Sequence, residues 1–139
     1  MEDKVHLSVV IPAYNEEPNF AKGSLDEVTK YLEKQGYGYE VLIVDDGSSD
    51  NTASLAQEFA RKNEFVRVIK NPHQGKAETV KTGVEKASGE LILFTDFDQA
   101  TPITEVEKLL PFFPQNDIVI GSRQLPGAKR EKEPFHRHL

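Results

Sequence analysis

The sequence predicts an α/β fold in which a doubly wound, mainly parallel sheet carries helices on both faces. Short β-rich apolar runs alternate along the chain with segments whose apolar residues recur at helical spacing, which is typical of strand–helix–strand units. No internal repeat or low-complexity tract interrupts this alternation. The 139 residues, of which 37% are hydrophobic, suffice for one domain with a real core.

Five apolar runs are predicted strands, and they cover residues 7–12, 40–44, 66–69, 90–95 and 117–121. Four helices are predicted between them, each from apolar residues that share one face. These residues are Leu25, Val28 and Leu32, then Leu55 and Phe59, then Ala77, Val80, Val84 and Ala87, then Val106, Leu109, Leu110 and Phe113. Ser88-Gly89 ends the third helix, and Thr101-Pro102 begins the fourth with a cap and a proline in its first turn.

The composition excludes several classes of protein. No cysteine is present, so neither a disulfide framework nor a thiolate zinc site can form. The net charge of -6 argues against a nucleic-acid binder. Residues 121–139 hold five basic and two acidic side chains, which leaves 12 basic and 21 acidic residues elsewhere. No apolar run approaches the roughly 20 residues of a membrane span and no signal-peptide pattern begins the chain, so we expect a cytoplasmic protein.

Two aspartates, Asp96 and Asp98, follow an apolar run that is predicted to be a buried strand. If strand geometry continues as far as these residues, their side chains share one face. Paired carboxylates suit Mg²⁺ or Mn²⁺, which usually keep waters and take further ligands from a substrate diphosphate. Aspartate is also common in solvated turns after strands, so this pair alone leaves both interpretations open.

Polar segments follow four of the predicted strands, at the sheet edge where ligands bind in such folds. They are residues 12–17, 45–50, 96–98 and 121–123. Taken singly, Ser49 and Asp50 are better interpreted as a turn and a helix cap. Tyr14 is equally well a surface aromatic, and residues 15–18 equally well a turn. Lys76 follows Gly75 at a helix entrance whose N–H groups suit phosphate, although a solvated lysine is the simpler interpretation. Together the segments favour a site for an anionic ligand.

These segments resemble the nucleotide-binding half of a family-2 glycosyltransferase with the Rossmann-like GT-A fold. The matching blocks, in the family's order, are VVIPAYNE at 9–16, VLIVDDGSSD at 41–50, GKA at 75–77 and the Asp-x-Asp (DXD) motif DFD at 96–98. Thr101-Pro102 and residues 117–123 look most like the enzymes that glycosylate dolichyl or other polyprenyl phosphates, the dolichyl-phosphate beta-glucosyltransferases in particular.

The resemblance implies an inverting, metal-dependent transfer of a sugar, which we expect to be glucose, from a nucleoside diphosphate sugar to a polyprenyl or dolichyl phosphate. UDP-glucose and GDP-mannose are the expected donors, and Mg²⁺ or Mn²⁺ is the expected cofactor. The implied nucleotide-sugar-binding residues are Pro12, Tyr14, Glu16, Asp45, Asp46, Lys76 and Asp96. The implied metal ligands are Asp96 and Asp98, and the implied catalytic residues are Asp98 and Arg123.

The expected acceptor is already ionised, so it needs no general base, but positive charge is needed to bring two anions together. We therefore expect Arg123 to contact the lipid phosphate or the donor diphosphate, with help from the region of Lys129, Arg130 and Arg137. For Lys129, Arg130 and Lys132 a solvated tail is the preferred interpretation.

Two departures from the family pattern affect these expectations. Some polyprenyl-phosphate enzymes carry a further metal ligand, a glutamine, two positions after the second aspartate; here that position is Ala100, and Gln99 precedes it. The family domain also normally continues into acceptor-binding and membrane-associating segments. We therefore expect residues 1–124 to form the nucleotide-sugar-binding half and 125–139 to begin a truncated acceptor region. Peripheral contact with the cytoplasmic membrane face would then depend on the missing part.

Two alternatives stay open. One is a nucleotide-sugar-binding module without activity. The other is a receiver-like signalling domain, because residues 41–46 resemble its acidic first strand, with Asp96 as the phosphoryl acceptor and Ser122 as a later hydroxyl. The receiver hypothesis leaves the strand at 7–12 unexplained and finds no lysine at the strand end after Ser122.

Overall fold

The computed structural model describes residues 4–129, so Arg130, Lys132 and Arg137 lie outside the described residues. The chain divides into two compact units, Met1–Thr104 and Glu105–Leu139, and each is described by itself. The predicted boundary after residue 124 stays a prediction. Within the part of the chain that the structure describes, no helix is long and apolar enough to cross a membrane.

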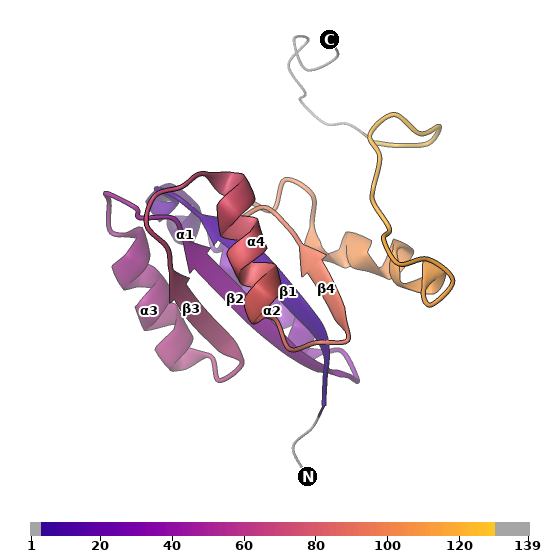
Figure 1. The fold of residues 1–139 in the computed structure, drawn as a ribbon, viewed down its shortest axis with the longest axis horizontal. Coiled ribbons are helices and arrows are strands. Elements are labelled where there is room, and N and C mark those ends of the chain that lie inside the picture. Colours follow the sequence, from indigo (N-terminus) through magenta and orange to yellow (C-terminus); the bar gives the residue numbers. More distant parts are fainter. Residues whose placement is uncertain (1–3, 130–139) are drawn as a thin grey trace. The chain divides into compact units, whose positions relative to one another are not determined.

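The first unit is built on a four-stranded parallel sheet in the order β3-β2-β1-β4 (Figure 1). The strands are β1 (Val5–Ala13), β2 (Gly38–Asp45), β3 (Val66–Lys70) and β4 (Leu91–Phe94). In the centre of the sheet, Val10 pairs with Leu42 of β2 on one side and with Phe94 of β4 on the other. The predicted α/β fold and its first four strands are therefore confirmed.

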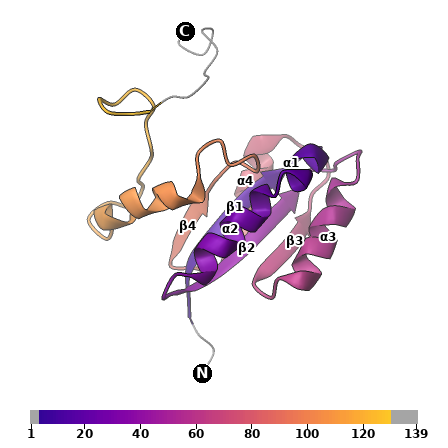
Figure 2. The ribbon, with the colours of Figure 1, turned by 180° about the vertical axis from the view of Figure 1, so that it is seen from behind.

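Helices cover both faces of this sheet. They are α1 (Glu17–Ala21), α2 (Ser24–Glu33), α3 (Thr52–Lys62) and α4 (Lys76–Lys86). Figure 1 shows α4 in front of the sheet, and Figure 2, seen from behind, shows α2 and α3 on the opposite face. The steps from β1 to β2 and from β2 to β3 run in one direction, whereas α4 returns the chain across the sheet to β4. Because such crossovers are right-handed, the return places α4 on the other face.

The core lies between these helices and the sheet. On the α4 face, Val10, Leu42 and Val44 form a buried cluster. A Cβ atom on Gly83 of α4 would lie 2.3 Å from Cγ1 of Val10, so only glycine lets the helix approach the sheet this closely. On the other face α2 buries Leu25, Val28 and Leu32. Coverage on both faces explains why β1 and β2 are almost continuously apolar.

The order of the strands reverses at β1, because the chain after β1 leads to β2 on one side while β4 lies on the other. In a doubly wound sheet, the loops at the carboxyl ends of the strands separate at this point and leave a crevice for a ligand. The loops after β1 and β4, which contain Tyr14 and Asp96, lie here.

The structure corrects two of the predicted elements. The predicted strand at 117–121 is wrong: these residues form no strand, and Ile118 and Ile120 are 83% and 79% exposed. An apolar run adopts strand geometry only when a neighbouring strand satisfies its backbone groups. The predicted fourth α-helix is replaced by two 3₁₀ segments, η1 (Ile103–Lys108) and η2 (Leu110–Phe112). Pro111 and Pro114 lack the N–H groups that an α-helix would need there.

Candidate functional site

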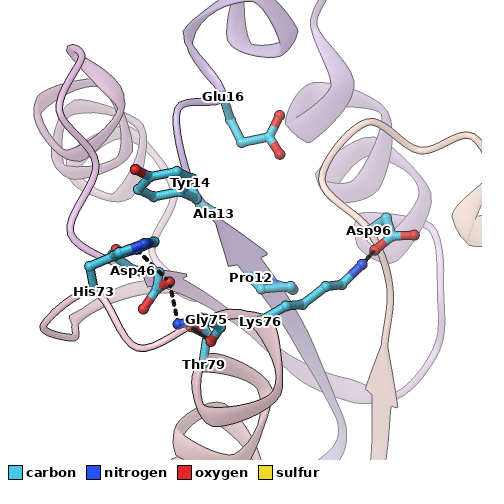
Figure 3. Close-up of a pocket in the computed structure, with 10 residues that line it drawn as sticks. All are labelled: Pro12, Ala13, Tyr14, Glu16, Asp46, His73, Gly75, Lys76, Thr79 and Asp96. Carbon is cyan, nitrogen blue, oxygen red and sulfur yellow. Dashed lines mark hydrogen bonds and ion pairs between the residues drawn. The ribbon is translucent and has the colours of Figure 1, made fainter.

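A pocket of about 200 Å³ lies at the carboxyl ends of β1, β2 and β4, next to the entrance of α4 (Figure 3). The residues that line it are Pro12, Ala13, Tyr14, Glu16, Asp46, His73, Gly75, Lys76, Thr79 and Asp96. The pocket therefore sits at the reversal point of the sheet, where the topology predicts a ligand crevice. Residues that line the pocket come from distant segments, since Pro12 and Asp96 are 84 residues apart in the chain.

Asp46 holds the loop that leads from β3 into α4. Asp46 is only 3% exposed, and its carboxylate accepts hydrogen bonds from the backbone N–H groups of Gln74, at 2.9 Å, and Gly75, at 3.0 Å. Burial raises the pKa of Asp46, but the hydrogen bonds from the N–H groups of Gln74 and Gly75, together with the nearby Thr79 and His73 side chains, outweigh burial and lower the pKa. Asp46 is therefore an ionised anchor of the pocket wall.

Tyr14 and His73 form an aromatic pair on one side of the pocket (Figure 3). Their ring centroids are 4.4 Å apart and their planes differ by 23°, so the rings are stacked. Nδ1 of His73 lies 3.0 Å from Oδ2 of Asp46, which orients the imidazole. A flat aromatic surface with a polar edge is suited to a planar heterocycle such as a nucleobase.

Lys76 and Asp96 lie on another side of the same pocket. Lys76 is the first residue of α4, Asp96 follows β4, and their side chains form an ion pair (Figure 3). Nζ of Lys76 also lies 5.4 Å from the centroid of the Phe94 ring. An ammonium and a carboxylate are thus both available where an anionic ligand and its counter-cation would meet.

Asp98 is exposed and does not line the pocket. Because β4 ends at Phe94, strand alternation does not extend to the two aspartates, and they flank the buried ring of Phe97, which packs on Phe20 at 4.9 Å. Oδ1 of Asp98 accepts a hydrogen bond from the N–H of Ala100 at 3.0 Å.

The side chains available as metal ligands determine how a metal ion could be bound here. Among residues 4–129, no group of three or more histidine, cysteine, aspartate or glutamate side chains is arranged to hold a metal ion. An all-protein cage is therefore not built in this part of the chain. Asp96 and Asp98 offer two carboxylates with hard oxygen atoms, which fits a Mg²⁺ or Mn²⁺ ion that takes its other ligands from water and substrate phosphate.

The predicted nucleotide-sugar-binding residues lie together with one exception. Pro12, Tyr14, Glu16, Asp46, Lys76 and Asp96 all line the pocket, whereas Asp45 does not. Asp45 is buried, and its carboxylate accepts hydrogen bonds from the hydroxyl of Ser48 at 2.5 Å and from the Ser48 N–H at 3.3 Å. Asp45 therefore shapes the loop after β2 in this structure.

Arg123 and Lys129 belong to the second unit, so their predicted roles at the phosphates stay predictions. Four further residues, Ala13, His73, Gly75 and Thr79, line the pocket without having been predicted as site residues. The signal for His73 is weak, because the segment after β3 carries no acidic residue to mark it. Thr79 lies one turn into α4, and its hydroxyl donates to the Gly75 carbonyl at 2.8 Å.

Comparison with known proteins gives a consistent result. The family model described as "Glycosyl transferase family 2" matches residues 8–139. The chain is 40% identical to human dolichyl-phosphate beta-glucosyltransferase over 144 residues, which cover 91% of this chain and 42% of that protein. It is 35% identical to the dolichol-phosphate mannosyltransferase of Pyrococcus furiosus, covering 96% of this chain and 37% of that protein. The chain therefore spans less than half the length of these curated relatives.

Among solved structures, the mannosyltransferase PcManGT from Pyrobaculum calidifontis, in complex with GDP-Man and Mn²⁺, superimposes with a TM-score of 0.61 and 27% identity over 76% of this chain and 31% of that chain. S. aureus TarS 1-349, in complex with UDP, gives a TM-score of 0.53 and 29% identity over 68% of this chain and 28% of that chain. These likenesses confirm the predicted GT-A fold.

Proposed function

The chain belongs to glycosyl transferase family 2, and we propose that its first unit is the donor-binding part of an inverting glycosyltransferase. The donor would be a nucleoside diphosphate sugar, and the acceptor a polyprenyl or dolichyl phosphate. The observation that carries this proposal is the pocket at the reversal point of the sheet, which combines an aromatic wall, a lysine and a carboxylate at the end of β4.

Each part of the donor would be bound by different residues of the pocket. The stacked rings of Tyr14 and His73 would face the base, and the carboxylate of Glu16, which accepts a hydrogen bond from Asn19 at 2.6 Å, would accept from base or ribose donors. Lys76 would stand near the diphosphate as a supporting cation. Asp46 would act indirectly, because its oxygens already bind the loop that leads into α4.

Asp96 and Asp98 would hold a Mg²⁺ or Mn²⁺ ion together with the donor diphosphate. When bound, this ion would neutralise the diphosphate and stabilise it as a leaving group. The support comes from the two exposed carboxylates after β4 and from the presence of Mn²⁺ with GDP-Man in the similar mannosyltransferase. The acceptor phosphate would then displace the nucleoside diphosphate directly at the anomeric carbon. The bound cation would compensate the negative charge of the departing diphosphate.

Glucose is the favoured sugar, because several curated relatives are named dolichyl-phosphate beta-glucosyltransferases, and mannose is the second choice. A polyprenyl phosphate is ionised near neutral pH, so it would attack without a general base. Arg123 would supply positive charge to the lipid phosphate or to the donor diphosphate. The lipid acceptor would bring the protein to the cytoplasmic face of a membrane as a peripheral protein.

A turnover assay tests this function. The chain is incubated with Mn²⁺, a short polyprenyl phosphate and either radiolabelled UDP-glucose or GDP-mannose, and label in the extracted lipid is measured against an Asp98→Asn variant. Metal-dependent labelling from one donor supports the enzyme, and labelling from neither donor together with absent nucleotide binding contradicts the proposal.

A second candidate is a nucleotide-sugar-binding module without transfer activity. The observation that favours it is that the residues lining the pocket suit a nucleotide, whereas Arg123, the residue expected at the acceptor phosphate, belongs to the second unit. Nucleotide binding with no labelled lipid in the same assay would support this module.

A further inference from the structure

Lys76 reaches across the pocket to a residue from a different element. It begins α4, after the loop that Asp46 anchors, while its partner Asp96 follows β4. Figure 3 shows the extended side chain of Lys76 pointing from α4 toward Asp96. The ammonium also lies 5.4 Å from the centroid of the Phe94 ring, so an aromatic face stabilises this position of the cation.

The ion pair is open to exchange. The Lys76 side chain is 60% exposed and that of Asp96 is 52% exposed. Ion pairs this exposed to water contribute little to stability, because water screens them and two long side chains lose freedom. The pair is therefore not needed to hold α4 against β4, and both partners are accessible to a ligand in the pocket.

Two positive charges compete for Asp96. Lys76 occupies Oδ1 of this carboxylate in the structure, and the divalent ion of the proposed function needs the same carboxylate. A divalent ion beside an ammonium is repelled, so the two cannot share Asp96 without a cost in free energy. A diphosphate that arrives with the ion offers Lys76 another anionic partner in the same pocket.

We propose that Lys76 is a placeholder cation, which neutralises Asp96 in the empty pocket and gives way only when the divalent ion and the nucleoside diphosphate bind together. The inference rests on the proposed function, since it assigns the regulation of the same site. Lys76 then makes the ion bind weakly alone and strengthens the coupling between ion and nucleotide. In thermodynamic terms, each ligand raises the affinity of the other by the same factor.

The test compares variants of the 139-residue chain that lose the same charge at different places. Lys76→Met removes the placeholder. Lys81→Met is the matched control, because Lys81 is also exposed on α4, pairs with Glu78 at 3.8 Å and does not line the pocket. Lys76→Arg keeps the charge. Mn²⁺ affinity is measured without nucleotide by the electron paramagnetic resonance signal of free Mn²⁺, and then again with UDP or GDP present.

The Lys76→Met variant is expected to bind Mn²⁺ alone about three- to tenfold more tightly than the unmodified chain, because the competing cation is gone. Lys81→Met is expected to match the unmodified chain, and Lys76→Arg, which keeps a competing positive charge, should not show this gain. The gain should vanish in the double variant Lys76→Met/Asp96→Asn. In Lys76→Met the factor by which Mn²⁺ tightens UDP or GDP binding should fall.

Equal Mn²⁺ affinity in the Lys76→Met and Lys81→Met variants, in a chain that does bind UDP or GDP with Mn²⁺, would overturn the placeholder role alone. A gain that persists in the double variant would overturn it as well, because the gain would not act through Asp96. Failure of every variant to bind Mn²⁺, with or without nucleotide, would overturn both this inference and the proposed function.

Discussion

Nδ1 of His73 lies 3.0 Å from Oδ2 of Asp46, which ties the loop after β3 to the carboxyl end of β2. The same carboxylate accepts the N–H groups of Gln74 and Gly75, so one buried side chain fixes three consecutive residues that lead into α4. The pocket wall is therefore organised before a ligand arrives. Binding then costs less ordering entropy than it would with a loose loop.

Replacing Asp46 with asparagine should destabilise the first unit. An asparagine amide offers one acceptor oxygen where the loop needs two, and its NH₂ group would face a backbone N–H. We expect Asp46→Asn to lower the free energy of unfolding by about 1–3 kcal/mol, measured by urea denaturation. Asp117→Asn, at an exposed aspartate, serves as the control and should leave stability unchanged.

The contribution of Asp46 should also depend on pH. Since folding lowers the pKa of Asp46 below its ordinary value of 3.8, its stabilisation is present above that value and is lost as the pH falls through the lower pKa of the folded state. Unfolding free energies measured from pH 6 down to pH 3 should therefore fall less steeply in Asp46→Asn than in the unmodified chain. Parallel curves would contradict the assignment.

A second buried carboxylate, Glu40, should affect stability without affecting the pocket. It is 7% exposed and accepts hydrogen bonds from the Ser8 hydroxyl, from the N–H and hydroxyl of Ser88, and from Arg67. Glu40→Gln would place an NH₂ group, which can only donate, next to groups that also donate hydrogen bonds. We therefore expect a loss of about 2–4 kcal/mol in unfolding free energy.

Glu40 lies near the amino end of β2, and the pocket lies at the carboxyl ends of the strands. Nucleotide affinity of the folded Glu40→Gln variant should therefore equal that of the unmodified chain. Glu58→Gln, which breaks an exposed pair with Lys62, is the control and should change neither quantity. Weaker nucleotide binding in Glu40→Gln would contradict this separation.

Gly83 should not tolerate a side chain. A Cβ atom at this position would lie 2.3 Å from Cγ1 of Val10 and 3.1 Å from Cγ2 of Val44. The resulting overpacking should cost about 1–3 kcal/mol and outweigh the gain of about 1 kcal/mol in helix propensity. Thermal unfolding of Gly83→Ala is compared with Gly36→Ala, where nothing lies within 4 Å. A melting temperature of Gly83→Ala at or above that of Gly36→Ala would show that α4 does not pack this closely.

His73 should contribute to nucleotide binding through its stack with Tyr14. His73→Ala removes both the stacked ring and the partner of Asp46, and we expect UDP or GDP with Mn²⁺ to bind about two- to tenfold more weakly by calorimetry. His6→Ala is the control, because His6 pairs with Glu90, its ring lies tilted at 5.3 Å from the Tyr37 ring, and it does not line the pocket. Equal losses in both variants would exclude a specific role for His73.

The sequence predicts the sheet well where burial on both faces makes a strand continuously apolar, as in β1 and β2. It fails at 117–121, where Ile118, Val119 and Ile120 form a short apolar run but no neighbouring strand pairs with them in the described chain. Local pattern cannot supply that neighbour. The predicted fourth helix fails for a different reason. Pro111 and Pro114 lack the backbone N–H groups that α-helical hydrogen bonds would need, and 3₁₀ turns form instead.

For the site, position at a strand end is enough to bring Tyr14, Glu16 and Asp96 to one edge, because parallel strands end together. Position at a strand end does not show which of the adjacent residues Asp45 and Asp46 lines the pocket. In the structure Asp46 lines it, whereas the Asp45 carboxylate binds Ser48. Position at a strand end also misses His73, whose contact with Asp46 spans 27 residues and depends on the pairing of β2 with β3.

Calorimetry of nucleoside diphosphate binding tests the proposed donor site most directly. UDP and GDP are titrated into the unmodified chain with Mn²⁺ or with EDTA, and into Asp98→Asn with Mn²⁺. We predict that one nucleotide binds with Mn²⁺ and that its affinity falls at least about tenfold with EDTA and in Asp98→Asn. Absence of binding for both nucleotides, or equal affinity with Mn²⁺ and with EDTA, would contradict a metal-dependent donor site in this pocket.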